Sequence, residues 1–546
     1  KYYTSKAHVA GSEAGREQTE WTVEKLKSWG ISTRIDEYEP LLGWPTKRSL
    51  VVKSHPNIKL KLAEDVVEED PTSKNPNETP SFLAYTGNGT VTGAELVYVN
   101  FCSENDFKLL KDRNISVSNR IVICKFGDES RGSMIKRAES FGAVGHISFT
   151  EPSEDGYTLG PVYPNGPFRP ASGIQRGTAK TLNGYGGDPL TPFYPAKSGV
   201  PRLSINETAL IKIPAIPIGY GDALQLLQAI ETKGFKGKDL GKTWQGDLNV
   251  TYWTGPGASL DFEMEQSLQI KKVWNVIGEI KGSVEPDRVI MLSNHRDAWV
   301  YGAVDPNSGT AVLMEVARIF GQMYKEGWRP ARTIMFASWD AEEYGLVGST
   351  EWVEEYIKTL DKTLVACINI DSGSSGSKFR ALSSPSMATI LREVAKTVTD
   401  PKTKQSLYEA WKSYGNQTSN GQIVPLVGAL GGSSDYVAFQ YHVGAPSMDL
   451  SFRQSHGVYH SNYDSFHYME KFGDPKYEYS ALLTEFLGRL FLRFSDDEKL
   501  PFDYIPYAES LQKFTVDTTT LFKEKNITIP LTDLAQTVEA FKQLVN

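Results

Sequence analysis

Three almost continuously apolar stretches in the second half of the chain constrain the fold more than any other feature. They span 289–294, 333–339 and 364–370, and stretches with helical periodicity separate them at 310–324 and 350–360. Apolar strands that alternate with helices are typical of a largely parallel sheet covered on both faces. The sequence therefore predicts an α/β domain with a mixed, largely parallel sheet flanked by helices.

Each apolar stretch ends in ionisable residues. His295 and Asp297 follow the first stretch, Glu342 and Glu343 follow the second, and Asp371 follows the third. In a parallel sheet the carboxyl ends of the strands meet at one edge, which is where ligands bind. Imidazole and carboxylate groups without cysteine suit zinc at a catalytic centre. The pattern therefore predicts a metal site at this edge.

Asp305, ten residues after His295, and His460 in a later Tyr-His pair complete a set for two ions. One histidine, one aspartate and a shared aspartate would satisfy one zinc, and a glutamate, the second histidine and the same shared aspartate would satisfy the other. Glu342 and Glu343 are adjacent, so one can hold metal while the other acts as general base. Asp297 can accept the imidazole N–H of His295 and fix its tautomer.

Length and charge limit the alternatives. A chain of 546 residues is long enough for more than one domain, and its formal net charge of -8 gives no basic surface for nucleic acid. Between the N-terminal helix and strand pattern at 17–38 and the apolar stretches, the composition becomes acidic, turn-rich and strand-rich. We predict an insert over 54–269 within a discontinuous domain formed by 1–53 and 270–499.

Cysteine and asparagine patterns bear on the compartment. Cys102, Cys124 and Cys367 are too few and too scattered to predict a disulfide framework or a cysteine zinc site. Asn-x-Ser/Thr sequons favour a secretory protein, and they begin at Asn77, Asn88, Asn114, Asn206, Asn249, Asn416 and Asn526. No apolar stretch reaches the roughly 20 residues that a membrane span needs. The remaining histidines are predicted to be structural: His8, His55, His146, His442, His456 and His467.

The ordered motifs around these residues resemble a known family. His295-x-Asp297 with Asp305, the segment from Trp339 to Trp352, Asn369-Ile-Asp371-Ser and Tyr459-His460-Ser are similar to the co-catalytic zinc peptidases of family M28, in the branch of glutamate carboxypeptidase II and the transferrin receptor. The resemblance extends from about residue 10 to about residue 501. It implies a zinc exopeptidase domain with an inserted protease-associated, β-rich apical domain.

The resemblance also implies roles for single residues. It assigns His295 and Asp371 to one zinc and Glu343 and His460 to the other, with Asp305 bridging. Glu342 would be the general base, and the Tyr459 hydroxyl would stabilise the oxyanion. Residues 500–546 would begin a helical, dimer-forming domain that continues beyond this chain. An N-terminal type II membrane anchor before this chain would place the protein outside the cell, on its surface or in a vacuole.

The resemblance implies a further metal site between the insert and the peptidase domain. The segment from Gly187 to Pro195 resembles the family segment that holds a structural calcium ion together with two acids of the peptidase domain. The matching positions are Thr191, Tyr194, Glu351 and Glu354. All four offer oxygen ligands, which suit a hard cation.

Departures from the family pattern concern the substrate. Glutamate-specific members carry two arginines where this chain has Asp449 and Ser451, and Ser434 and Thr178 replace family asparagines. Arg131 matches the family arginine that binds the substrate carboxylate, and Arg380 is a candidate match for another. We therefore expect poor cleavage of N-acetyl-aspartyl-glutamate and folate polyglutamates. Both carboxypeptidase and aminopeptidase action stay open, because Asp449 could receive a cationic group.

The sequence argues against two other classes of protein, a non-catalytic receptor and a protein kinase. A receptor-like protein on the same scaffold, such as the transferrin receptor, would lack a working peptidase site, but this chain keeps every predicted zinc ligand. The triplet from His295 to Asp297 is similar to the catalytic loop of protein kinases, yet the required leucine and later asparagine do not follow. The sequence therefore favours a di-zinc exopeptidase acting on peptides or acyl-amino acids.

Overall fold

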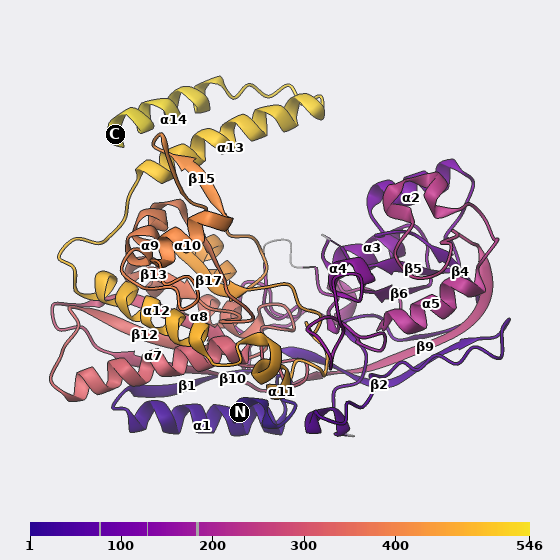
Figure 1. Ribbon diagram of the computed structural model, residues 1–546, viewed down its shortest axis with the longest axis horizontal. Helices are drawn as coiled ribbons and strands as arrows, with labels where there is room; N and C mark the ends of the chain where they lie inside the picture. The colour runs from indigo at the N-terminus through magenta and orange to yellow at the C-terminus, as the bar shows by residue number, and fades with distance from the viewer. Residues whose placement is uncertain (76–77, 128, 182–184, 546) are drawn as a thin grey trace.

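A computed structural model of the chain describes residues 1–75, 78–127, 129–181 and 185–545 (Figure 1). It contains a seven-stranded sheet and a six-stranded sheet that lie side by side. The sequon at Asn77 lies outside the described residues.

The seven-stranded sheet has the order β1-β10-β12-β11-β13-β17-β14. Its four central strands β12, β11, β13 and β17 are parallel, and the outer pairings are antiparallel. This confirms the predicted mixed, largely parallel sheet. The strands span Ser32–Tyr38 (β1), Val273–Ile280 (β10), Glu285–His295 (β11), Arg332–Trp339 (β12), Leu364–Asn369 (β13), Lys378–Ser383 (β14) and Ser447–Arg453 (β17).

Helices cover both faces of this sheet, as the apolar strands require. The helices α1 (Glu13–Ser28), α7 (Asn307–Lys325) and α12 (Glu478–Asp496) share one core with Ile290 and Leu292 of β11. The helix α8 (Val347–Thr363) packs on the opposite face, in a core that contains Met291. Successive residues of β11 thus point to opposite faces, and both faces are buried.

The six-stranded sheet has the order β2-β9-β4-β5-β6-β8 and belongs to the insert. Strands β4, β5, β6 and β8 are parallel, α2 and α3 lie between successive strands, and α5 follows β8, so the insert is itself an α/β unit. The bounds are Leu41–Val52 (β2), Gly257–Ile270 (β9), Gly89–Tyr98 (β4), Ile121–Lys125 (β5), Gly145–Phe149 (β6), Ala215–Ile218 (β8), Glu104–Asp112 (α2), Arg131–Ser140 (α3) and Tyr220–Ala229 (α5).

The long strands β2 and β9 pair with each other and join the two sheets (Figure 1). The chain leaves the seven-stranded sheet after Tyr38 and re-enters it at Val273. The changeover between sheets therefore falls at residues 39–40 and 271–272, so that β2 belongs with the insert. The predicted domain ranges, with a first boundary at residue 53, stay a prediction.

One apolar core runs through the insert and across its contact with the peptidase sheet. The ring of Phe82 from the insert meets Trp299 with centroids 5.2 Å apart, and Tyr85 meets Tyr344 at 5.8 Å. The Tyr344 hydroxyl also donates to the carbonyl of Gly43. The insert is therefore packed against the loops that follow β11 and β12.

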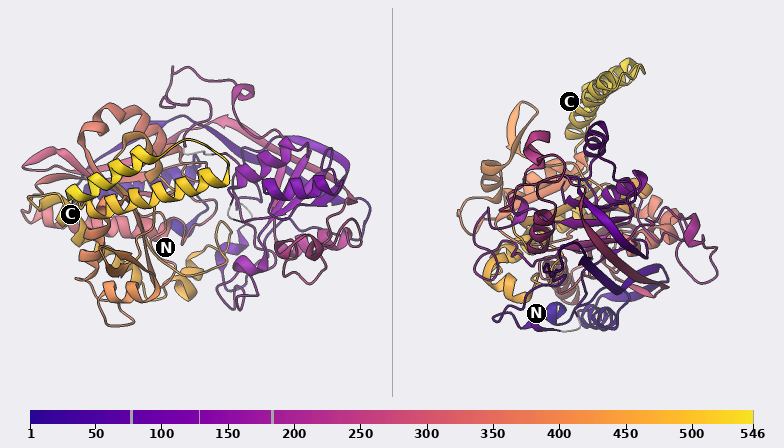
Figure 2. Two further views of the ribbon diagram at one scale, coloured as in Figure 1. Left: turned by 90° about the horizontal axis from the view of Figure 1, so that it is seen from above. Right: turned by 90° about the vertical axis from the view of Figure 1, so that its right-hand side faces the viewer.

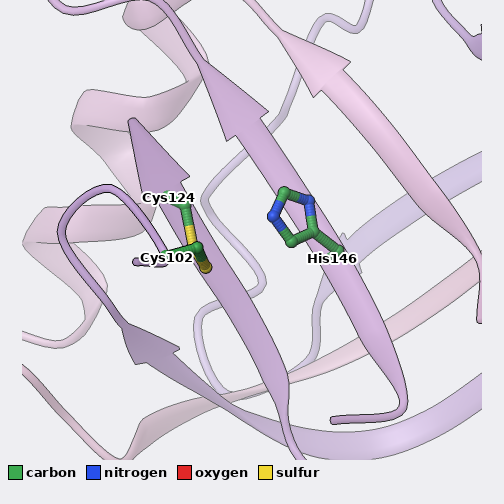
Figure 3. A group of neighbouring side chains, drawn as sticks. All are labelled: Cys102, Cys124 and His146. Carbon is green, nitrogen blue, oxygen red and sulfur yellow. A yellow bond between two sulfur atoms is a disulfide. The ribbon is translucent and has the colours of Figure 1, made fainter. Parts of the chain in front are cut away.

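Two of the three cysteines form a disulfide, which the sequence did not predict. The parallel pairing of β4 and β5 brings Cys102 and Cys124 together with their Cα atoms 5.8 Å apart (Figure 3). Their sequence separation of 22 residues hid this pairing, because only the register of the two strands places them side by side. Cys367 is buried and free.

The predicted C-terminal helical segment is confirmed. Helices α13 (Ile505–Glu524) and α14 (Thr532–Val545) form a hairpin that projects from the body of the molecule (Figure 2). Across the described part of the chain, no helix has the length and apolarity to cross a membrane. The other helices and short strands are α4 (Pro152–Asp155), α6 (Gly237–Leu240), α9 (Ala388–Ala395), α10 (Leu407–Tyr414), α11 (Phe466–Tyr468), β3 (Leu83–Ala84), β7 (Gly177–Thr178), β15 (Asn416–Ser419) and β16 (Gln422–Pro425).

Candidate metal centre

The five predicted zinc ligands come together at the carboxyl ends of the parallel strands. His295 is the last residue of β11, Glu343 follows β12, and Asp371 follows β13. Asp305 precedes α7, and His460 lies in the loop after β17. Asp305, Glu343, Asp371 and His460 line a cavity of about 890 Å³ between the peptidase sheet and the insert.

The ligand atoms form two groups that share Asp305. In the first group, Nε2 of His295 lies 3.3 Å from Oδ1 of Asp305 and 3.6 Å from Oδ1 of Asp371. In the second, Nε2 of His460 lies 3.3 Å from Oδ2 of Asp305 and 3.1 Å from Oε2 of Glu343. Each oxygen of Asp305 therefore faces a different imidazole.

These separations fit zinc. Two ligand atoms that each lie about 2.0–2.1 Å from one tetrahedral ion are about 3.3–3.4 Å from each other. Hydrogen bonds between the histidines and the acids could have similar lengths. However, Oε1 of Glu343 is buried and finds no hydrogen-bond partner among the described residues. An unpaired buried carboxylate oxygen is costly, and a cation would satisfy it.

A main-chain contact orients the imidazole of His295. Nδ1 of His295 lies 3.0 Å from the main-chain carbonyl of Asp297 and 3.6 Å from its carboxylate. The Asp297 carboxylate instead accepts the N–H groups of Glu342 and Glu343, at 2.9 and 3.2 Å. Asp297 thus fixes the turn that carries the two glutamates, and its carbonyl, rather than the predicted carboxylate, sets the tautomer of His295.

Burial and crowding perturb the groups at the centre. Burial raises the pKa of Glu342 well above its ordinary value, and it also raises the pKa of Glu343, whereas His295 and His460 respectively oppose these shifts. Burial alone would lower the pKa of His460, but Glu343 and Asp305 raise it to about 9.

The pKa of the shared ligand, Asp305, shifts in the opposite direction to the pKa values of the two glutamates. Burial would raise the pKa of Asp305, but its contacts with His295 and His460 lower it below the ordinary value. Asp305, Glu342, Glu343 and Asp371 would together carry four negative charges when ionised, which two divalent cations would balance. The donor set therefore fits two zinc ions.

Glu342 and Tyr459 lie beside the ligand groups without belonging to them. Oε2 of Glu342 is 3.9 Å from Nε2 of His295, farther than any of the ligand contacts described above. Tyr459 precedes His460 and lines the same cavity. Arg131, at the start of α3, also lines it, and its guanidinium carbon lies 5.6 Å from the centroid of the Tyr459 ring.

Three of the residues that depart from the family pattern line the cavity: Thr178, Ser434 and Asp449. The carboxylate of Asp449 on β17 is buried; it accepts from the side chain of Asn369 at 3.1 Å and lies 3.5 Å from Arg380. Burial raises the pKa of Asp449, and Asp371 adds to the shift. Ser434 also accepts from Asn369, at 2.9 Å.

Two further predicted contacts have partners within the protein. The hydroxyl of Ser451 accepts from Nε of Arg453 at 2.8 Å, and the hydroxyl of Thr178 lies 3.5 Å from the carbonyl of Tyr344. Arg453 lines the cavity, as does His456, a histidine for which the sequence predicts a structural role. The cavity lining thus offers Arg380 and Arg453 as cations near the carboxylate of Asp449.

The predicted calcium residues meet between α8 and the insert. The carboxylate of Glu351 accepts the N–H groups of Asp188 and Ala196, each at 2.5 Å. Glu354 accepts from the hydroxyl of Tyr185, and its second oxygen is buried without a partner in the described chain.

Charge at this second site is also unbalanced. Burial raises the pKa of Glu351 well above its ordinary value and the pKa of Glu354 to about 7. Thr191 donates its hydroxyl to Asp188, and the Tyr194 side chain is exposed. The two glutamates fit a cation, whereas the side chains of Thr191 and Tyr194 do not face them, so a role for these two positions would fall to their main-chain carbonyls.

A third group with metal-binding side chains lies in the insert. Cys102, Cys124 and His146 have ligand atoms within 4.8 Å of one another. Figure 3 shows the imidazole on the strand next to the disulfide. The sulfur atoms are bonded to each other and are therefore not thiolates, which is the form that binds metal. His146 is a buried structural residue, as predicted.

Several residues around the centre were missed by the sequence analysis. Asp464 accepts the N–H groups of Val304 and Asp305, at 2.7 and 3.1 Å, and so links the His460 loop to the bridging aspartate. Arg176 of the insert contacts His460 directly. No spacing or periodicity marks these positions, because each acts as a single residue across a long sequence separation.

Comparisons with known proteins match two parts of the chain to family models. Residues 275–475 match the model of peptidase family M28, and residues 91–182 match the PA domain. A "Probable glutamate carboxypeptidase" of Arthroderma benhamiae is 39% identical over 532 residues, which cover 94% of this chain and 71% of that protein. "Aminopeptidase NAALADL1" of Mus musculus is 37% identical over 513 residues, with 88% and 68% covered.

Solved structures share the fold at low identity. A peptidase M28 precursor from Shewanella amazonensis has a TM-score of 0.55 at 17% identity, covering 90% of this chain and 91% of that one. An aminopeptidase from an Aneurinibacillus species has a TM-score of 0.51 at 17% identity, covering 91% and 93%.

Proposed function

Because the chain belongs to peptidase family M28, it is a metallopeptidase, and we propose that it is a di-zinc exopeptidase that hydrolyses a terminal peptide bond. The observation that carries the proposal is the pair of ligand groups joined by Asp305. Either group alone could be a buried hydrogen-bond cluster. Two groups that share one carboxylate, each with an imidazole and a further acid, are typical of co-catalytic metal sites.

His295, Asp371 and Asp305 would hold one zinc, and His460, Glu343 and Asp305 would hold the other. When bound, the two ions supply Lewis acidity toward the scissile carbonyl and lower the pKa of water. Glu342 is the general base: it takes a proton from the attacking water and passes it to the leaving nitrogen. The Tyr459 hydroxyl donates a hydrogen bond to the developing oxyanion.

Metal analysis tests this proposal. Protein prepared without chelator should carry about two zinc ions per chain, and His295→Ala should lose activity and at least one ion. His55→Ala is a matched control, because this exposed histidine lies in the insert, outside both ligand groups. A wild-type protein with far less than two zinc ions, or an active His295→Ala variant, would refute the proposal.

The substrate is a peptide or acyl-amino acid without a strict requirement for C-terminal glutamate. In support, Asp449 and Ser451 occupy the positions at which the family pattern of glutamate-specific members has arginines, and Arg380 is already paired with Asp449. The relatives include both a carboxypeptidase and an aminopeptidase by name, and this chain offers Arg131 for a carboxylate and Asp449 for an amine. A mass-spectrometric digest of a mixed peptide library would show which end shortens, and selective release of C-terminal glutamate would contradict the proposal.

A non-catalytic receptor is the second candidate. It would share the fold and the insert, but its function would not require both ligand groups and a separate general base. The presence of Glu342 beside an intact set of five ligands therefore favours the enzyme.

We further propose a structural calcium ion held by Glu351 and Glu354 with Thr191 and Tyr194. The unpartnered oxygen of Glu354 and the raised pKa values of both glutamates support it. A divalent cation there would tie α8 to the insert.

The proposal extends to compartment and assembly. All six sequon asparagines among the described residues are exposed: Asn88, Asn114, Asn206, Asn249, Asn416 and Asn526. They support passage through the secretory pathway, with a type II anchor in the complete product, and glycosidase treatment should reduce the apparent mass. We expect a homodimer of the complete product, which light scattering tests.

A further inference from the structure

The backbone of Tyr459 and His460 is held from the insert rather than from the peptidase domain that contains it. His460 has a φ of 57°, in the left-handed region that a residue with a side chain rarely adopts. Such a conformation persists only where the surroundings impose it. The residues that surround the main chain here come from the loop before β7 of the insert.

Arg176 contacts both the main-chain carbonyl and the imidazole of His460. Its backbone N–H and Nη1 both lie within hydrogen-bond distance of the His460 carbonyl, at 3.2 and 3.3 Å. In return, Nδ1 of His460 lies 2.9 Å from the Arg176 carbonyl. Nη2 of Arg131 also lies 3.3 Å from this Nδ1, but the carbonyl contact is shorter and favours the proton on Nδ1, which leaves Nε2 as the lone-pair nitrogen facing Asp305 and Glu343.

Glu64 fixes the guanidinium of Arg176. Its Oε2 lies 2.6 Å from Nη2, and both side chains are almost fully buried, at 0% and 2% exposure. Its other oxygen accepts the N–H groups of Ile174 and Asn462, at 3.1 and 3.2 Å. Glu64 therefore joins the Arg176 loop to Asn462, the residue two positions after His460.

A second buried arginine holds the preceding residue. Nη2 of Arg169 donates to the Tyr459 carbonyl at 3.0 Å, and the Arg169 side chain is fully buried. Its charge is balanced by Asp155, with Nε and Oδ2 2.8 Å apart. The main-chain carbonyls of Tyr459 and His460 are thus each bound by a buried arginine of the insert, and each arginine is paired with an acid of the insert.

We propose that Arg169 and Arg176 are positioning residues through which the insert orients Tyr459 and His460, so that the metal centre is complete only when the insert is docked. The inference rests on the proposed zinc site and adds to it a dependence on insert residues that touch neither metal nor substrate. The two arginines should also have separable effects, because Arg176 acts on a ligand and Arg169 acts on the residue that bears the oxyanion donor.

The test compares zinc affinity and turnover in the full chain. Arg176→Met alone would leave Glu64 as an unpaired buried charge, so the variant is Glu64→Gln with Arg176→Met. Dialysis against buffers of fixed free zinc should show one of the two ions bound about 10- to 100-fold more weakly, as expected when a partner of a ligating histidine is lost. The ion held by His295 and Asp371 should keep its affinity.

Arg169 gives the complementary result. Asp155→Asn with Arg169→Met should keep both zinc ions at wild-type affinity while kcat falls about 10-fold or more. A role that is merely structural would lower thermal stability without separating zinc affinity from turnover in this way.

Arg332→Met is the matched control. This arginine is also buried and donates to main-chain carbonyls, of Phe494 and Asp497, but it lies at the opposite end of the parallel strands. It should lose stability and retain both ions. If the Glu64 and Arg176 double variant does not fold, Arg176→Lys, which keeps the charge but not the fork of donors, is measured in its place.

The outcomes separate the two proposals. A folded Arg176 variant that binds both zinc ions with wild-type affinity overturns this inference. A wild-type protein that binds no pair of zinc ions overturns the proposed function instead.

Discussion

Replacing Arg131 decides whether the enzyme holds a substrate carboxylate. Arg131 is the first residue of α3, and its guanidinium carbon lies 5.6 Å from the ring centroids of both Phe126 and Tyr459. Its Nη2 donates to Gln175 at 2.6 Å, and a Cβ on Gly177 would come within 2.6 Å of its Nε, so the group is held in place before substrate binds. A pre-organised arginine of this kind suits recognition of a planar carboxylate.

The magnitude follows from one hydrogen bond to a charged group, which contributes about 1.5–3 kcal/mol. Arg131→Met should therefore lower kcat/KM for a peptide with a free C-terminal carboxylate by about 10- to 140-fold. The assay uses that peptide and its C-terminal amide with both forms of the enzyme. Because Arg131 also touches the Tyr459 ring, both peptides can lose some turnover, and the ratio of the two losses isolates the carboxylate contact.

Arg113→Met, an arginine outside the cavity, is the control and should change neither peptide. Equal losses for the acid and the amide would refute carboxylate recognition by Arg131. If the same enzyme also failed on N-acetylated peptides, aminopeptidase action would follow, and Asp449 would become the candidate partner of the substrate amine.

Three further outcomes are expected. Glu342→Gln should keep both zinc ions and lose at least about 10³-fold in kcat, since an amide cannot take the proton; turnover above a few per cent would exclude the base role. Burial raises the pKa of Glu354 from 4.5 to about 7, so its protonated form stabilises the fold below pH 4.5 and this contribution is lost as the pH rises through 7. Calcium should therefore raise Tm more at pH 8 than at pH 5.5, and Glu354→Gln should reduce the difference, leaving the part that comes from Glu351. Cys102→Ala with Cys124→Ala opens a loop of 22 residues and should lower the free energy of unfolding in urea by about 3.4 kcal/mol; an unchanged value would contradict a disulfide.

The strands and the ligands could be predicted for the same physical reason. Apolar stretches without polar interruptions must be buried on both faces, and this alone determined β11, β12 and β13. Parallel pairing then forces their carboxyl ends together, so acids that follow different strands become neighbours. His295, Glu343 and Asp371 met this condition, and the structure places all three at the same edge of the sheet.

The partners of these ligands could not be predicted, because they depend on atoms rather than on residue types. The carboxylate of Asp297 binds two main-chain N–H groups, while its carbonyl meets the imidazole. Nothing in a sequence separates the two roles. The disulfide is similar: Cys102 lies in a loop after β4, and only the register between β4 and β5 brings it to Cys124.

The long sequence separations between the centre and its supports have a common origin in the path of β2 and β9. The chain leaves the peptidase sheet after Tyr38, builds the insert, and returns at Val273. Every contact between insert and centre therefore joins residues that lie far apart along the chain. Such contacts exist only where both sheets are docked, as they are where Phe82 packs on Trp299 in their common core. A peptidase domain without its insert would keep all five ligands in its sequence, but it would expose that core and lose the arginines that hold Tyr459 and His460. Retention of a ligand motif in a relative is consequently a weaker indicator of an intact metal centre than retention of the motif together with the buried pairs of the insert.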